Sequence, residues 1–196
     1  MKTLLKTSAL AGIVISSLFA SGCATRCKPS SPYNPPPLEP LSNFTAYELR
    51  PVTPGPRASR GWPNNVGVAK IQANLAKDTE RLLHDWNQRG AGREGATRTL
   101  VIDPEVAVIK HVNVPLRLLT GPFIGNSGVL LRVTLTEKET GKVIAMPEFS
   151  RRRNWFTGTM SFGIADNGNL RGVSSLVKKY LANNYNKAAG GPTGGR

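Results

Sequence analysis

Residues 129–135, with the sequence VLLRVTL, carry the clearest strand pattern in this chain. Strict alternation places every second side chain on the same face of a strand. The apolar face predicted in this way comprises Val129, Leu131, Val133 and Leu135. Residues 137–141 favour a turn in which Gly141 can adopt a positive φ, and residues 143–152 are expected to pair back as the second strand of a hairpin.

Two further strands are expected before this hairpin. Residues 98–112 alternate over most of their length, but Pro104 has no backbone N–H to donate. The strand is therefore expected either to break at Pro104 or to lie at an edge of the sheet. Residues 44–50 form a shorter strand-like run, and residues 51–65 are rich in proline and glycine and are expected to be irregular.

Two helices are also predicted. In residues 66–89, apolar side chains recur at three- and four-residue steps, and Thr79 fills the one turn that lacks an apolar residue. Asn64 or Asn65 can cap the start of this helix, and Gly90 can end it. Residues 169–185 predict the second helix, whose apolar face comprises Leu170, Val173, Leu176, Val177, Tyr180 and Leu181.

The expected order of elements is strand, helix, strand, strand, strand, helix. This order indicates an α+β domain over residues 44–187, with a small, mainly antiparallel sheet and two helices packed on one face. A chain of 196 residues allows one domain of ordinary size with extensions. With 39% hydrophobic residues, the core is expected to be modest.

The first 22 residues have the composition of a secretory leader. Two lysines precede an apolar run over residues 9–20, which is too short to span a bilayer comfortably. The ending Ala20-Ser21-Gly22-Cys23 resembles the lipobox of bacterial lipoproteins, although that family prefers Leu where Ala20 stands. The resemblance implies cleavage before Cys23 and acylation there, palmitate being a typical chain, which together give stable anchoring. The alternative is an ordinary signal peptide.

Both ends of the mature chain are expected to lie outside the domain. Residues 23–43 are predicted to form the lipidated N-terminus and a proline-rich tether, because polyproline structure buries little surface. Deleting residues 29–40 is therefore expected to leave stability nearly unchanged. If Cys23 is acylated, Cys27 has no partner within the chain and is interpreted as an incidental thiol. Residues 188–196 are glycine-rich and are predicted to be disordered.

The chain carries a large excess of positive charge. The formal net charge is +14, and removal of residues 1–22 takes away two lysines and leaves +12. Such an excess favours anionic partners, such as phospholipid headgroups, glycolipids or other acidic polymers. Export and the lack of a nucleic-acid-binding pattern argue against nucleic acid. The densest basic run is Arg151, Arg152 and Arg153, which is either a candidate interaction site or the solvated end of a strand.

A resemblance to a known group rests on four segments: Asp103-Pro104-Glu105, the glycine-rich stretch 120–128, the strand 129–135 and the run Thr140-Gly141-Lys142-Val143-Ile144-Ala145. These segments are similar to a family of uncharacterised bacterial lipoproteins with a domain of unknown function. The layout also resembles small periplasmic α+β lipoprotein domains that assist curli secretion or activate penicillin-binding proteins. The resemblance implies an envelope-assembly lipoprotein of the outer-membrane type, and it transfers no functional residues.

The sequence shows no residue set that is typical of catalysis or metal binding. His84 and His111 stand alone, without metal-ligand spacing around them. Ser127 does not lie in a nucleophile elbow, and Pro104 between Asp103 and Glu105 disfavours a paired-carboxylate site. We therefore predict no enzymatic activity, no cofactor and no metal.

Two apolar, glycine-flanked loops complete the prediction. Phe123 and Ile124 lie in one, and Trp155 and Phe156 lie in the other. These side chains either fold onto the core or form an exposed patch that contacts a partner. The predicted function is a membrane-anchored, non-enzymatic interaction or assembly module of the cell envelope, with a protein partner or a homo-oligomer. Ala24 after the cysteine favours the outer membrane, facing the periplasm. The alternatives are a binder of peptidoglycan or anionic glycolipid, and a hydrolase with an unrecognised site.

Overall fold

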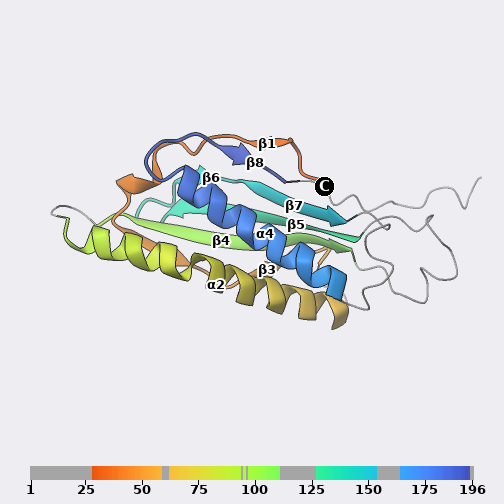
Figure 1. Cartoon of the computed structure of the whole chain (residues 1–196). Helices are drawn as coiled ribbons and strands as arrows, with labels where there is room; N and C mark the ends of the chain where they lie inside the picture. Colours follow the sequence, from red (N-terminus) through yellow and green to blue (C-terminus); the bar gives the residue numbers. More distant parts are fainter. Residues whose placement is uncertain are drawn as a thin grey trace, which may run out of the picture.

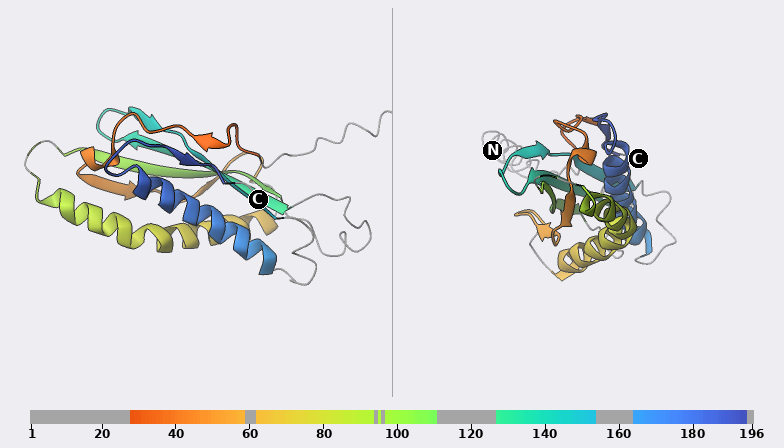
Figure 2. Two further views of the ribbon diagram at one scale, coloured as in Figure 1. Left: turned by 45° about the horizontal axis from the view of Figure 1, so that its top comes forward. Right: turned by 90° about the vertical axis from the view of Figure 1, so that its left-hand side faces the viewer.

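The computed structural model of the chain describes residues 28–58, 62–93, 95, 97–110, 127–153 and 164–194. These residues form an α+β fold, as predicted, in which two helices lie side by side on one face of a sheet (Figures 1 and 2). The elements are β1 (Tyr33–Asn34), the 3-10 helix η1 (Leu41–Asn43), β2 (Ala46–Leu49), β3 (Thr53–Pro54), α2 (Trp62–Ala91), β4 (Thr99–Lys110), β5 (Ser127–Glu137), β6 (Val143–Ala145), β7 (Glu148–Arg153), α4 (Ile164–Asn183) and β8 (Gly191–Pro192).

The main sheet is built around the long antiparallel pair β4 and β5, whose register runs from Leu100 opposite Glu137 to Lys110 opposite Gly128. The predicted apolar face of β5 is confirmed, because all four of its alternating residues are buried in the core. The hairpin partner expected over 143–152 is present as two strands, β6 and β7, which both pair with β5. On the outer edge of β4, β2 and β3 run parallel to it, so the sheet is mixed.

Pro104 does not break β4, which is continuous from Thr99 to Lys110. Instead, the edge of the sheet beside β4 is divided at this point into β2 and β3. β2 pairs with β4 as far as Ile102, and β3 pairs with it from Glu105. The carbonyl of Pro104 faces the hydroxyl of Thr53 at 3.5 Å, so the backbone nitrogen of Pro104 points to this same side. The missing N–H therefore falls between two short edge strands, where it costs no ladder hydrogen bond.

Both helices follow the predicted periodicity but begin earlier, at Trp62 and Ile164. Thr79 does fill the expected turn of α2, since its side chain is fully buried and its hydroxyl donates to the carbonyl of Leu75 at 2.7 Å. Trp86 of α2 stacks on Tyr185, just after α4, with ring centroids 4.3 Å apart. The helices are thus joined to each other as well as to the sheet.

The prediction that residues 23–43 form a tether is wrong for the described residues 28–43. Leu41 in η1 is completely buried in the core, and its backbone N–H donates to the carbonyl of Asn184 at 2.9 Å. Asn34 is buried and pairs with Gly191 across β1 and β8. The prolines keep this segment extended, as expected, but it lies along the sheet and contributes to the core.

The prediction of a disordered C-terminal tail is also wrong for residues 188–194. β8 lies beside β1, and the N–H of Ser150 in β7 donates to the carbonyl of Thr193 at 2.8 Å. Gly190, with φ at 76°, turns the chain back along β7, and its N–H donates to the buried side chain of Asn184. The folded unit therefore extends from residue 28 to residue 194, well beyond the predicted 44–187.

Candidate functional site

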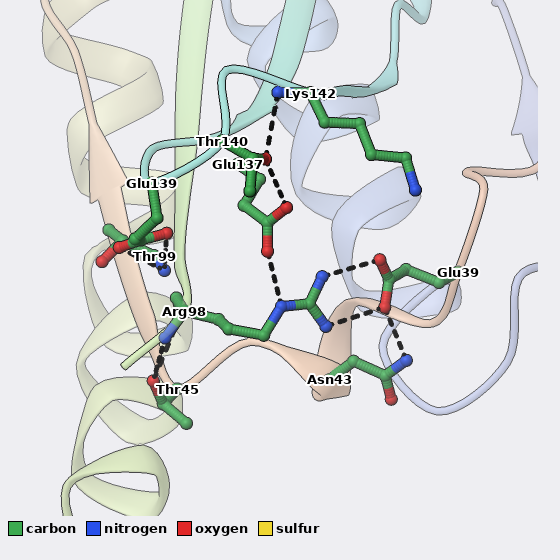
Figure 3. Close-up of polar contacts among 9 residues, drawn as sticks. All are labelled: Glu39, Asn43, Thr45, Arg98, Thr99, Glu137, Glu139, Thr140 and Lys142. Atoms are coloured by element: carbon green, nitrogen blue, oxygen red, sulfur yellow. Dashed lines mark hydrogen bonds and ion pairs between the residues drawn. The ribbon is translucent and has the colours of Figure 1, made fainter. Parts of the chain in front are cut away.

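The densest ionic cluster in the described part of the chain surrounds Arg98, at the start of β4 (Figure 3). The guanidinium group donates from Nε to Glu137 at 2.6 Å, and from its two terminal nitrogens to the two carboxylate oxygens of Glu39 at 2.8 and 3.0 Å. The guanidinium carbon also lies 4.6 Å from the centre of the Phe44 ring. One side chain thus connects the N-terminal segment, β4 and β5.

Both carboxylates of this cluster are held in the ionised form. The hydrogen bonds from Arg98 lower the pKa of Glu39 to about 2, and Asn43 donates a further bond at 2.8 Å. The hydroxyl of Thr140, followed by Arg98, lowers the pKa of Glu137. A general acid needs a raised pKa, so this arrangement suits ion pairing and not proton donation.

The cluster therefore holds separate segments of the chain together through ion pairs, and we call it the Arg98 clamp. The bidentate pair between Arg98 and Glu39 fixes the N-terminal segment against the strand edge with defined geometry. Sequence reasoning missed these residues, because positions 39, 98 and 137 share no spacing that marks them as neighbours. Only the long-range pairing of β2, β4 and β5 brings them together.

The predicted basic triplet lies at the end of β7, opposite the beginning of β5. Arg152 is exposed, whereas Arg151 is partly buried and its side chain lies against Gly172 of α4. Strand alternation thus turns these two neighbours toward opposite faces of the sheet. The triplet is not one continuous side-chain surface.

The other predicted site residues, Cys23, Phe123, Ile124, Trp155 and Phe156, lie outside the described residues, and their roles stay predictions. So do the leader and both apolar loops. The described residues that flank the loop segments can be placed: Lys110 lies opposite Gly128, and Ser127 lies opposite Arg153. Both segments therefore connect to the same end of the sheet.

Four large hydrophobic side chains are exposed among the described residues: Tyr33 at 53%, Leu38 at 66%, Val143 at 44% and Met146 at 54%. Two of them lie in the N-terminal segment, one in β6 and one directly after β6. We refer to these four side chains as the exposed apolar margin. The N–H of Leu38 donates to the carbonyl of Ile144 at 3.0 Å, which joins the two backbone segments. In Figure 1, β1 and β6 lie on the side away from α2.

The described residues also form a surface depression. A shallow, open depression of about 500 Å³ lies between β3 and the first turns of α2. It is lined by Pro51, Val52, Pro54, Asn65, Val68, Ala69 and Gln72. In the same part of the chain, no three His, Cys, Asp or Glu residues converge on a metal-sized site. Neither described helix is long and apolar enough to cross a bilayer.

Comparison with known proteins gives only distant structural similarity. No family model and no curated protein sequence matches the chain. The PelC dodecamer from Paraburkholderia phytofirmans is similar with 12% identity and a TM-score of 0.38, over 73% of this chain and 93% of that one. A candidate lipoprotein from Caulobacter crescentus is similar with 10% identity and a TM-score of 0.35, over 73% of this chain and 93% of that one. A protein of unknown function from Xanthomonas campestris is similar with 12% identity and a TM-score of 0.39, over 76% of this chain and 86% of that one. Similarity at this level assigns neither a family nor a function.

Proposed function

We propose that this chain is a lipid-anchored, non-enzymatic interaction or assembly module of the cell envelope. The leader and the cysteine at its end support export and anchoring through Cys23, with the folded unit in the periplasm and the lipid in the outer membrane. The observation that carries the interaction role is the exposed apolar margin. Its partner is a second copy of this chain or another envelope protein.

The margin is held in place before any partner arrives. Tyr33 lies in β1, which pairs with β8, and the side chain of the next residue, Asn34, hydrogen bonds to the backbone of Glu148. Leu38 is fixed to β6 through its own N–H. A preformed surface loses little conformational entropy on association, so burial of these side chains contributes directly to affinity.

The proposal is tested by cross-linking the full chain in cells and capturing it by affinity, with and without Leu38→Ser and Met146→Ser together. The double variant is expected to lose its cross-linked products, because two exposed apolar side chains are removed. Ala73→Ser with Ala76→Ser, on the exposed side of α2, is the matched control. Equal loss of cross-links in the margin variant and the control, or unchanged cross-links in the margin variant, would contradict the proposal.

The net charge favours a second candidate, a binder of an anionic envelope polymer such as peptidoglycan or glycolipid. This candidate predicts that the purified chain sediments with isolated cell-wall material in a salt-dependent manner. It also predicts that the margin variant sediments as well as the wild type does, which separates it from the first proposal.

A further inference from the structure

The connection between the anchoring cysteine and the folded unit is much shorter than the sequence indicates. The backbone N–H of Ser30 donates to a carboxylate oxygen of Glu148 in β7 at 2.7 Å. Ser30 is the seventh residue after Cys23. A fully extended chain of that length spans at most about 25 Å. A lipid on Cys23 therefore holds one particular part of the fold close to the bilayer.

That part is one end of the sheet. The described chain begins and ends near the tip of β7, and the tip of β4 lies beside it (Figure 1). The register confirms the grouping, because Lys110, Gly128 and Arg152 stand opposite one another on β4, β5 and β7. Residues 55–58 follow β3 toward the same end, where the N–H of Gly55 donates to the carbonyl of Val106. We call this region the basic end.

Charge is distributed unevenly between the two ends. The basic end comprises residues 28–32, 55–58, 107–110, 127–130 and 149–153, which include six basic residues. The basic residues are Lys28, Arg57, Lys110, Arg151, Arg152 and Arg153. Three acidic residues of the described chain border these ranges: Glu105 beside Gly55, Glu148, whose carboxylate pairs with Arg132 at 3.0 Å, and Asp166 in the first turn of α4. The opposite end, around the start of β4, carries Glu39, Glu48, Glu137 and Glu139 together with Arg98, Lys138 and Lys142, so positive and negative side chains nearly balance there. The fold is therefore polarised along its strands.

We infer that the basic end docks on anionic phospholipid headgroups of the bilayer that holds the lipid of Cys23. This inference rests on the proposed anchoring and adds an orientation to it. The short connection keeps the basic end near the surface, and each basic residue there strengthens partitioning onto an anionic membrane by about fivefold. When the basic end faces the bilayer, the exposed apolar margin remains free to contact a partner.

The test uses the chain from residue 23 onward, made without lipid as Cys23→Ser, because every described contact lies within residues 28–194. Binding is measured by sedimentation with phosphatidylethanolamine–phosphatidylglycerol vesicles and with phosphatidylcholine vesicles. Arg57→Glu with Arg152→Glu reverses two exposed residues of the basic end. Lys178→Glu with Lys179→Glu makes the same charge change on the exposed far half of α4.

The basic-end variant is expected to lose at least about tenfold in binding to the anionic vesicles, while the α4 variant retains most of it. Equal losses in both variants would overturn the inference, because net charge and not one end would then govern binding. Stronger binding to isolated peptidoglycan than to vesicles, or no binding to anionic vesicles, would also overturn it. Thermal unfolding confirms that each variant is folded. If one is not, Arg57→Gln with Arg152→Gln is compared with Lys178→Gln and Lys179→Gln instead. Lipid labelling at Cys23 is unaffected by these substitutions and tests the anchoring separately.

Discussion

The side-chain amide of Asn34 forms two hydrogen bonds with the backbone of Glu148, 114 residues away in the sequence. Its nitrogen donates to the Glu148 carbonyl at 2.9 Å, and its oxygen accepts from the Glu148 N–H at 2.8 Å. The amide thus satisfies the backbone of β7 as a neighbouring strand would. A segment with the composition of a tether is in this way attached to the main sheet, although among the described strands β1 itself pairs only with β8.

Asn34→Ala is expected to lower the free energy of unfolding by about 1–3 kcal/mol, because it leaves the partly buried N–H and carbonyl of Glu148 without the Asn34 side chain as a partner. Chemical unfolding of the leaderless chain measures this loss. Lys28→Ala, at an exposed position six residues earlier, serves as the control and is expected to change stability by less than about 0.5 kcal/mol. Equal stabilities for the two variants would show that the Asn34 contact contributes nothing.

Removal of the C-terminal strand gives a second prediction. A chain that ends at Ala189 lacks β8, so the N–H of Ser150 loses its partner and the side chain of Asn184 loses its two hydrogen bonds with Gly190. We expect a loss of at least about 2 kcal/mol, measured by thermal or chemical unfolding. A chain that lacks only residues 195 and 196 retains all of these contacts and is expected to unfold like the full chain. A disordered tail predicts no difference between the two truncations.

The opposite edge of the sheet is closed by a second amide. The side chain of Asn87 in α2 accepts from the N–H of Tyr47 at 2.7 Å and donates to its carbonyl at 3.1 Å. Asn87→Ala is expected to expose this edge of β2, lower stability by about 1–3 kcal/mol and promote concentration-dependent association. Light scattering over a range of concentrations measures the association. Gln88→Ala, exposed on the same helix, is expected to remain as dispersed as the wild type.

The Arg98 clamp predicts how stability depends on pH. The folded state lowers the pKa of Glu39 from 4.5 to about 2, so its stabilisation is complete above the unfolded value and is lost as pH falls toward 2. Glu39→Gln is expected to cost about 1–2 kcal/mol near neutral pH, allowing for its partial exposure, and much less at about pH 2. Chemical unfolding across this range measures both values. Glu80→Gln, exposed on α2, is the control, and a Glu39→Gln deficit that stays constant with pH would contradict this account.

Local pattern was sufficient to predict the centre of the fold. The alternation in β5 and the helical spacing around Thr79 are each encoded within about ten residues, and the structure places them as expected. The ends of the chain were not predictable in the same way. Pairing of Tyr33 with Pro192 depends on residues at opposite ends of the sequence, and a proline-rich composition describes an extended segment equally well whether it packs or not. The only local hint was the presence of Asn34 and Leu41 among the prolines.

The proposed membrane anchoring depends on Cys23, and metabolic labelling with an alkyne analogue of palmitate tests it directly. Full-length wild type and Cys27→Ser are expected to incorporate the label and to fractionate with membranes. Cys23→Ser is expected to lose the label and to accumulate as uncleaved or soluble protein. If Cys23→Ser instead matures normally and remains in the membrane fraction, this chain is not a lipid-anchored protein.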